Sequence, residues 1–307
     1  MAYSVYMAQG FDPGLTQTYS GQLRRIVNKD GTFNVRHVGG QYHLYLHIVS
    51  LSWKKFFLLA ICCFLFTNGV FASLYMAIGV ENLSGGDPQM SSLANAFFFS
   101  TQTLTTVGYG HISPRGYLVS SVAALEGMLG LMGFAVITGL LYGRISRPSA
   151  RIVFSDRMLV APYEGATSLQ FRIANARTNV LMDIEANMVL MTVDTDPDGK
   201  MKRKYAELPL ERNHVHLFPL SWTVVHPIVE SSPLWGKTAA EITALQAEVL
   251  ILIRCFDDTF SQTVNSLHSY RHEEIVWNSR FEPAFYFDER GDMVLQLDRL
   301  NAWRRAE

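Results

Sequence analysis

Charged side chains are scarce in this sequence. Asp, Glu, Lys and Arg make up 17% of its 307 residues, whereas about a quarter is usual in a soluble protein. The formal net charge is only −1, so the chain lacks the basic excess that binding to nucleic acid requires. We therefore expect no nucleic-acid partner. The few charges are unevenly placed, and the stretches without them indicate how the chain is organised.

Cysteine is scarce as well, and no catalytic constellation is present. Adjacent Cys62 and Cys63 and the distant Cys255 have neither metal-ligand spacing nor the arrangement of a disulfide framework. The Gly-Lys-Thr triplet at 236–238 resembles the end of a phosphate-binding loop, but Ser231 stands where that motif needs a glycine. We expect no enzyme activity and no cofactor.

Two histidine pairs have spacings that bring their rings together. His214 and His216 would share one face of a strand, and His268 and His272 are four residues apart. Neither pair has a cysteine or a carboxylate at ligand spacing that would complete a metal site. We interpret these histidines as surface or hydrogen-bonded residues rather than as ligands.

Two long stretches lack charge almost completely. Phe56–Val80 contains no charged residue, and Tyr117–Gly143 contains only Glu126. At about 1.5 Å of rise per residue, a helix over either stretch spans the roughly 30 Å of a bilayer core. The sequence therefore predicts two membrane-spanning helices.

The basic residues predict the orientation of these spans. Six Lys or Arg residues precede Phe56 and nineteen follow Gly143, while only Arg115 lies between the spans. Because segments rich in Lys and Arg stay in the cytoplasm, both termini should be cytoplasmic.

A third, shorter element lies between the spans. Residues 81–88 form a polar loop rich in turn residues, and Ser91-Ser92 can cap a helix over Leu93–Leu104. About twelve residues cannot cross a bilayer, so we interpret this helix as a re-entrant segment. The negative end of its dipole would point towards Thr105, where a cation would be stabilised.

The stretch Thr105–Gly110, Thr-Thr-Val-Gly-Tyr-Gly, follows directly. Its two glycines make it a poor helix and a poor strand. Rings of backbone carbonyls from four such stretches can replace the hydration shell of a potassium ion, and Thr-Val-Gly-Tyr-Gly is a known potassium filter sequence. We predict a selectivity filter at Thr106, Val107, Gly108, Tyr109 and Gly110, with K+ held by the carbonyls of the first four.

Residues at the ends of the spans predict contacts with lipid. Gln41–Trp53 carries tyrosines on an apolar face, which suits a helix lying in the membrane interface. Basic residues next to the inner leaflet attract anionic headgroups, and tryptophan is common at this depth. The predicted lipid-binding residues are Trp53, Lys54, Lys55, Arg144, Arg147 and Arg151. Membrane orientation alone would also explain the basic ones.

The second span carries candidate gate residues. Its ridge of candidates consists of residues four or eight positions apart, namely Glu126, Gly130, Phe134 and Tyr142. Because four residues are slightly more than one helical turn, this ridge turns slowly around the helix. Large side chains at its inner end can close a hydrophobic constriction. Phe134 and Tyr142 are the predicted gate, with packing against the first span as the alternative. Gly130 and Gly143 are predicted hinges, because glycine permits a bend or a close contact.

After residue 144 the pattern changes to short hydrophobic runs separated by turn signals, which predicts a β-sandwich. Only Thr238–Leu245 looks helical. The expected strands lie in Arg151–Val160, Leu169–Asn175, Ala186–Val193, Trp222–Pro227, Glu248–Cys255, Phe260–Ser266 and Glu274–Trp277.

The order of these elements is similar to that of the prokaryotic inward-rectifier potassium channels (KirBac type). The resemblance extends along the chain, through the motifs at Leu125–Gly130, Leu141–Pro148, Arg172–Asn175, Leu220–Ile228 and Glu274–Trp277. It implies a homotetramer in a bacterial cytoplasmic membrane, cytoplasmic immunoglobulin-like domains, and regulation by anionic lipids at the basic residues. It also implies that Phe134 and Tyr142 face the pore.

Three residues depart from the pattern of relatives. Phe134 stands where many eukaryotic relatives have an acidic residue that attracts Mg2+ or polyamine blockers, so strong rectification is not expected from this position. Gln102 replaces the relatives' glutamate behind the filter, and His111 follows the filter where many potassium channels have aspartate.

The expected architecture is a helical pore domain with two transmembrane helices and a re-entrant helix, followed by a cytoplasmic β-sandwich. The expected boundaries are 1–40 for an N-terminal arm, 41–148 for the interfacial helix and pore, and 149–307 for the sandwich. The expected function is passive, selective conduction of K+. A weakly selective cation channel, or a cytoplasmic ligand sensor with a membrane anchor, are the alternatives.

Overall fold

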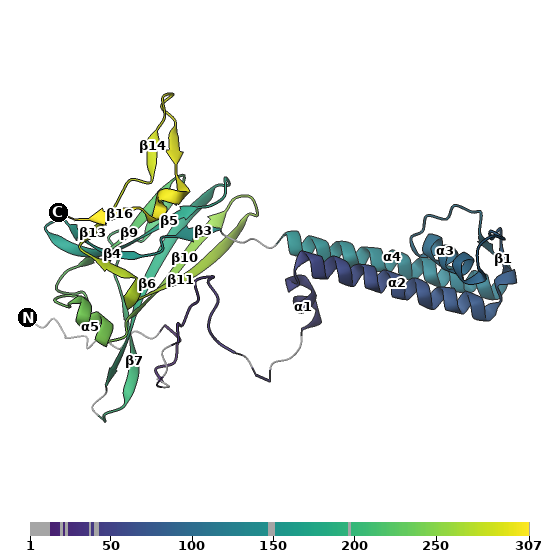
Figure 1. The fold of residues 1–307 in the computed structure, drawn as a ribbon, viewed down its shortest axis with the longest axis horizontal. Coiled ribbons are helices and arrows are strands. Elements are labelled where there is room, and N and C mark those ends of the chain that lie inside the picture. Colours follow the sequence, from purple (N-terminus) through teal and green to yellow (C-terminus); the bar gives the residue numbers. More distant parts are fainter. Residues whose placement is uncertain are drawn as a thin grey trace, which may run out of the picture. The chain divides into compact units, whose positions relative to one another are not determined.

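A computed structural model describes residues 13–18, 21, 24–36, 38–39, 43–146, 151–195 and 198–306. The chain forms two compact units (Figure 1). One is helical and comprises Gly39–Arg147, and the other comprises Met1–Val38 together with Pro148–Glu307 and is built from strands. The helical unit is therefore inserted between two parts of the chain that fold together.

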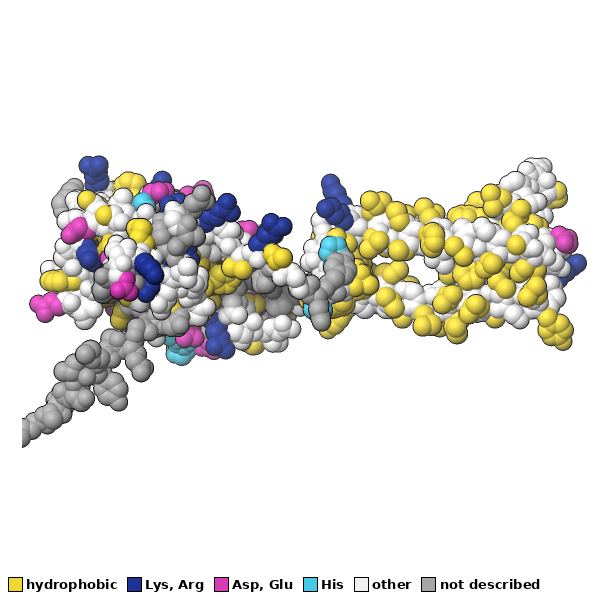
Figure 2. Space-filling model, turned by 90° about the horizontal axis from the view of Figure 1, so that it is seen from below, with side chains coloured by type: hydrophobic (Ala, Val, Ile, Leu, Met, Phe, Trp, Pro, Cys, Tyr) yellow, Lys and Arg dark blue, Asp and Glu magenta, His cyan; other side chains and the backbone are white. Residues whose placement is uncertain are grey.

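The helical unit contains the predicted spans and the short helix between them. Its elements are α1 (Leu44–Ser50), α2 (Trp53–Ile78), the single turn η1 (Val80–Asn82), β1 (Leu83–Ser84), α3 (Ser92–Leu104), β2 (Ser113–Pro114) and α4 (Tyr117–Ile145). Among the described residues, α2 and α4 are the helices long and apolar enough to cross a membrane. Figure 2 shows hydrophobic side chains along this unit, with charged ones gathered at its ends.

The interfacial helix is shorter than the predicted Gln41–Trp53. Gln41 lies outside the described residues, α1 ends at Ser50, and Trp53 belongs to the first turn of α2. The break falls at Ser52, whose backbone is extended with φ −61° and ψ 154°. An extended residue cannot continue the helical hydrogen-bond ladder, so the chain changes direction here.

The short helix α3 packs between the two long helices at the end of the unit away from α1 (Figure 1). Tyr75 of α2 and Phe99 of α3 lie edge to face with ring centroids 4.9 Å apart. They belong to a buried cluster that includes Ala72, Ala96 and Val119. The long helices α2 and α4 thus hold α3 between them in a defined place.

The strand unit is a two-layer sandwich. One sheet has the order β11-β10-β6-β7, with β8 also pairing with β6, and the other has the order β12-β4-β5-β3, with β9 also pairing with β5. The strands of the sandwich are β3 (Ile152–Phe154), β4 (Met158–Tyr163), β5 (Ala166–Asn175), β6 (Leu181–Thr195), β7 (Met201–Glu207), β8 (His214–Leu217), β9 (Ser221–Ile228), β10 (Glu248–Asp257), β11 (Gln262–Arg271) and β12 (Ile275–Trp277).

Shorter elements complete this unit. They are α5 (Ala239–Ala244), η2 (His272–Glu274), β13 (Ser279–Phe281), β14 (Phe285–Phe287), β15 (Met293–Leu295), η3 (Leu297–Asn301) and β16 (Trp303–Arg305). The predicted strand over Arg151–Val160 is in fact two strands, since residues 155–157 turn between β3 and β4. The predicted runs also omit β7, β8 and the paired short strands β13 with β16 and β14 with β15. Many residues of these strands are exposed, and the strands lack a clear hydrophobic alternation.

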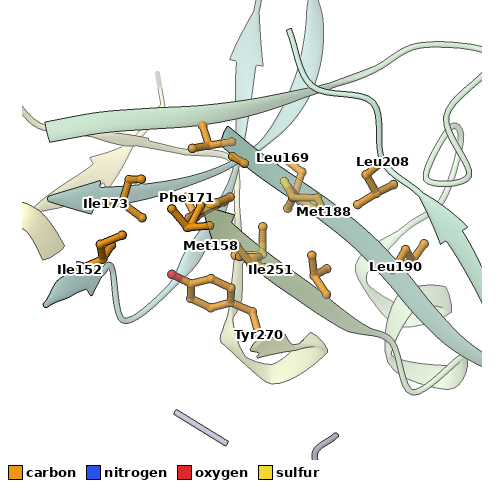
Figure 3. Close-up of a cluster of buried hydrophobic side chains, with 14 of the residues drawn as sticks. Ile152, Met158, Leu169, Phe171, Ile173, Met188, Leu190, Leu208, Ile251 and Tyr270 are labelled. Carbon is orange, nitrogen blue, oxygen red and sulfur yellow. The ribbon is translucent and has the colours of Figure 1, made fainter. Parts of the chain in front are cut away.

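The core of the sandwich comes from alternate residues of facing strands (Figure 3). Leu169, Phe171 and Ile173 on β5 meet Met188 and Leu190 on β6 in one buried cluster. The spacing of two follows from the alternation of side chains along a strand. This cluster accounts for the hydrophobic runs from which the strands were predicted.

The N-terminal segment 24–36 belongs to the sandwich unit. Ile26 and Val27 are buried, and the backbone N–H of Ile26 donates to the carboxylate of Glu248 over 3.1 Å. Ser269 donates through its hydroxyl to the carbonyl of Val27 over 2.7 Å. Arg25 pairs with Glu274. The beginning and the end of the chain are therefore joined by buried polar contacts.

Candidate ion-conduction site

The predicted filter has an alternating backbone. Thr106, Gly108 and Gly110 have positive φ angles of 59°, 53° and 80°, whereas Val107 and Tyr109 do not. Such alternation aligns successive N–H groups on one side of the chain. Because C=O points opposite to N–H in a trans peptide, the carbonyls align on the other side. A positive φ at Thr106 is costly for a β-branched residue, so the backbone of this segment is strained.

The last turn of α3 anchors this backbone. The N–H groups of both Val107 and Gly108 donate to the carbonyl of Gln102, over 3.0 and 3.3 Å. Two consecutive amides that share one acceptor must point the same way, towards α3. The carbonyls in the same two peptide units, those of Thr106 and Val107, consequently point away from the helix, to the side that is open in the single chain.

A buried polar network lies behind α3. The carboxylate of Glu126 accepts from the Tyr75 hydroxyl over 2.6 Å and from the Ser100 hydroxyl over 2.5 Å, and Ser100 is also 3.0 Å from the side-chain oxygen of Asn68. All four residues are fully buried. The network joins α2, α3 and α4 by groups that would be very costly to leave unpaired in an apolar environment.

Glu126 does not lie on the same face as the predicted gate. Each step of four residues turns about 40° around a helix, so Phe134 and Tyr142 are progressively rotated away from Glu126. Glu126 is buried against α2 and α3, whereas Phe134 and Tyr142 are 71% and 72% exposed in the single chain. Neither aromatic ring is therefore buried by packing on the first span of its own chain.

Phe134 lies on the side of α4 that carries the base of the filter. A largely apolar cavity of about 660 Å³ is lined by Phe64 of α2, Leu104 and Thr106 at the end of α3, and Phe134 of α4. Tyr142 lies two turns further along α4, outside this cavity. The structure thus brings Phe134, but not Tyr142, next to the filter.

The two predicted hinge glycines have different neighbours. A Cβ at Gly130 would lie 1.9 Å from the backbone oxygen of Leu104, and one at Gly143 would lie 2.8 Å from the Tyr45 hydroxyl. Both positions are inside the continuous helix α4. Gly130 permits the close approach of α4 to the end of α3, whereas Gly143 meets only the tip of a flexible side chain.

The predicted lipid-binding residues divide into two groups. Trp53, Lys54 and Lys55 are exposed in the first turn of α2, and Arg151 is exposed in the strand unit. Arg147 lies outside the described residues. Arg144 is engaged within the chain, where its guanidinium donates to the carbonyls of α1 and the residue after it.

The side chain of Arg144, from α4, caps the C-terminal end of the helix α1. It donates to the carbonyls of Ile48, Val49 and Leu51 over 3.1, 2.9 and 2.6 Å, and its guanidinium carbon lies 4.6 Å from the ring centroid of Trp53. Free carbonyls at a helix C-terminus favour a cation, and only arginine has a planar fork of five N–H donors. The sequence places Arg144 near the membrane, but it contains no signal for this contact.

A short helix that leads into an alternating, strained loop, held between two helices of membrane length, is the pore unit of an ion channel. Comparison with known proteins agrees. The family model "Inward rectifier potassium channel C-terminal domain" matches residues 152–306, and the model "Ion channel" matches residues 55–147. The chain belongs to the inward rectifier potassium channel family.

The similarity to individual relatives extends over most of the chain. Inward rectifier potassium channel Kirbac3.1 of Paramagnetospirillum magnetotacticum is 34% identical over 284 residues, which cover 90% of this chain and 95% of the relative. The human ATP-sensitive inward rectifier potassium channel 14 is 28% identical over 302 residues, covering 90% and 69%. These relatives are ion channels, which confirms both the predicted family and the prediction that the chain is not an enzyme.

Proposed function

We propose that four copies of this chain form a membrane pore that conducts K+ selectively and passively. The carbonyls of Thr106, Val107, Gly108 and Tyr109 from each copy would replace the hydration shell of the ion. K+ is then the permeant ion, and no cofactor is required. The observation that supports this proposal most directly is the shared acceptor of the Val107 and Gly108 amides, because it directs the carbonyls of Thr106 and Val107 to the open side of the loop.

Assembly follows from the exposure of the filter. One chain supplies carbonyls on one side only, and Tyr109 is 77% exposed in the single chain. Non-helical backbone at membrane depth is tolerated where it is buried in protein or lines a water-filled path. Four copies around an axis meet this condition, whereas a single copy does not.

Replacing Gly108 by serine in liposomes that contain the full chain tests the proposed function. Gly108 has φ +53°, so a side chain strains the filter and disturbs the carbonyl ring. K+ flux should fall at least about 100-fold. Gly165→Ser is the matched control, because Gly165 has φ +80° and open space around it but lies in a turn of the sandwich. Unchanged flux through Gly108→Ser would contradict the proposal.

Two further measurements distinguish the alternatives. A reversal potential that follows the K+ gradient and not the Na+ gradient separates a selective channel from a weakly selective one. A full chain that carries no current but binds a small metabolite would instead indicate a membrane-anchored sensor. A re-entrant helix and a strained loop are not needed by an anchor, which is why conduction is the proposal.

Control of conduction is proposed to lie below the filter. Phe134 and Tyr142 would form the constriction, because a ring of aromatic side chains can close a pore by excluding water. Gly130 and Gly143 would act as hinges at which α4 bends. Phe134 has no charge to attract Mg2+ or polyamines, so block by these cations should be weak at this position.

Anionic lipids are proposed to act at the inner membrane surface, through the exposed Trp53, Lys54 and Lys55 and through Arg147 and Arg151. Arg144 would act indirectly, by holding α1 in place. The proposed location is a bacterial cytoplasmic membrane with both termini inside, in keeping with the basic residues that flank the spans. Lys54→Gln combined with Lys55→Gln should reduce the difference in K+ flux between anionic and zwitterionic liposomes. An unchanged difference would remove these lysines from the lipid site.

A further inference from the structure

Two histidines project from one face of an edge strand of the sandwich. His214 and His216 lie two residues apart on β8, so their side chains leave the same face of the strand. Their ring centroids are 4.5 Å apart and the ring planes are nearly perpendicular, at 87°. Both rings are therefore held close together but are not stacked.

A carboxylate from another strand completes the group. β8 pairs with β6 through Met182↔Leu217 and Ile184↔Val215, which places Asp183 opposite His216. The oxygen Oδ1 of Asp183 lies 3.1 Å from Nδ1 of His216 and 3.6 Å from Nε2 of His214. The three ligand atoms all lie within 4.8 Å of one another.

The backbone of β6 is distorted at this point. Between Arg254↔Glu185 and Phe256↔Met182, two residues of β6 stand opposite one residue of β10, which is a β-bulge. Asp183 lies in this bulge with φ +48°, a left-handed conformation that is uncommon for a residue other than glycine. Bulges redirect side chains and are frequent next to functional sites. Here the bulge coincides with the carboxylate that meets the two histidines.

We propose that Asp183, His214 and His216 form a binding site for a divalent transition-metal ion of the zinc class. Two imidazole nitrogens and one carboxylate oxygen are a common protein ligand set for Zn2+. Tetrahedral ligands at about 2.1 Å from Zn2+ lie about 3.4 Å apart, close to the two distances from Asp183. Imidazole ligands favour Zn2+, Cu2+ or Ni2+ over Mg2+ and Ca2+.

The site is open to solvent. The side chains of Asp183, His214 and His216 are 66%, 39% and 82% exposed, so small movements can bring the ligand atoms to bonding distance. Three protein ligands leave one tetrahedral position for water. The sequence alone missed this arrangement, because Asp183 is far from the histidines along the chain and reaches them only through the pairing of β6 with β8.

Zn2+ titration of the full-length protein in detergent, purified with a tag that contains no histidine, tests the proposal. Calorimetry should show one Zn2+ per chain, and Co2+ in its place should give the intense visible absorption of a tetrahedral site. His214→Gln, His216→Gln and Asp183→Asn should each weaken Zn2+ binding at least about 10-fold, a loss that even residues behind the ligands can cause. Asparagine tolerates the left-handed backbone, so Asp183→Asn keeps the bulge.

Two control variants and one competition complete the test. Asp194→Asn removes another exposed carboxylate of β6, one that forms an ion pair with Lys204. His43→Gln removes an exposed histidine outside this unit. Both variants should bind Zn2+ like the unmodified protein. Zn2+ binding should persist in a large excess of Mg2+. Equal binding by all variants, or displacement of Zn2+ by Mg2+, would overturn the proposal.

Discussion

Gly130 of α4 and Leu104 of α3 approach so closely that a Cβ at residue 130 would lie 1.9 Å from the Leu104 carbonyl oxygen. Leu104 is the last residue of the helix that leads into the filter. The absence of a side chain at residue 130 therefore lets α4 pack directly against the end of α3, where the chain enters the filter.

Gly130→Ala should disrupt this contact. A methyl group cannot share the space of a backbone oxygen, so α3 or α4 must shift, at a cost of about 1–3 kcal/mol or more. K+ flux in liposomes should fall at least about 10-fold. Gly133→Ala is the control, because Gly133 lies on the same helix with no atom of the chain near its Cβ position. Equal flux from the two variants would show that the close approach is unimportant.

Tyr75→Phe should destabilise the helical unit. It removes the hydroxyl that donates to Glu126 and leaves a buried carboxylate oxygen without a partner, which costs about 1–3 kcal/mol. Thermal unfolding in detergent measures the loss. Tyr117→Phe makes the same change at a residue of α4 that is 96% exposed, and it should leave the melting temperature unchanged. A loss of the same size in both variants would argue against the network.

Arg144→Lys should release α1 although the positive charge is kept. An ammonium group cannot reproduce the contacts of the guanidinium with three carbonyls. Hydrogen exchange of residues 44–50 in the full chain should accelerate at least about 10-fold, the equivalent of about 1.4 kcal/mol. Lys55→Arg is the reciprocal control at an exposed position, and it should not alter the exchange. Unchanged protection in Arg144→Lys would mean that charge alone holds α1.

Tyr142→Ala should raise the resting K+ leak several-fold if this ring closes the pore as proposed. The ring is mostly exposed in the single chain and so is available to an axis formed by four copies. Tyr117→Ala, at the other end of α4, should leave the leak unchanged. Single-channel recording in defined lipid measures open probability, and an unchanged value in Tyr142→Ala would assign Tyr142 to packing between copies.

The stability of the sandwich should fall at mildly acidic pH because of His268. Burial lowers the pKa of His268 from 6.5 to about 4. The smaller effects of the Arg25 and Lys29 charges lower this pKa further, whereas those of the Glu274 charge and of a hydrogen bond with the Lys29 backbone raise it. The unfolded chain then binds a proton below pH 6.5 that the folded chain does not, so stability decreases as pH falls from about 6.5 to about 4.

The contribution of His268 to this loss can be isolated. Between pH 7 and pH 5 it should amount to about 2 kcal/mol. His268→Phe keeps an aromatic ring against Phe154, whose ring centroid is 4.5 Å from that of His268, and removes the titrating group. The pH dependence of unfolding should therefore be shallower in this variant by that amount, and an identical dependence would exclude His268 as its source.

Much of the pore unit was predictable because its signals are local. The uncharged runs marked α2 and α4, and Ser91 was predicted as a cap and accepts from the N–H of Ala94. The glycines at 108 and 110 indicated a backbone that ordinary residues avoid. Each of these features depends on a few neighbouring residues, so the spacing of residue types is sufficient to identify it.

Contacts between distant parts of the chain were not predictable in the same way. Glu126 was the lone charge of its span, but nothing in the sequence indicated that Tyr75 and Ser100 would bind it. The contacts of Arg144 with the carbonyls at the end of α1 had no signal in the sequence, and Asp183 joins His214 and His216 only because β6 and β8 pair. The local spacing of residue types determines which helices and strands form and which helices can cross a membrane. The partners of each buried or charged group depend instead on how those elements pack. Packing brings together residues whose separation in the sequence follows no rule.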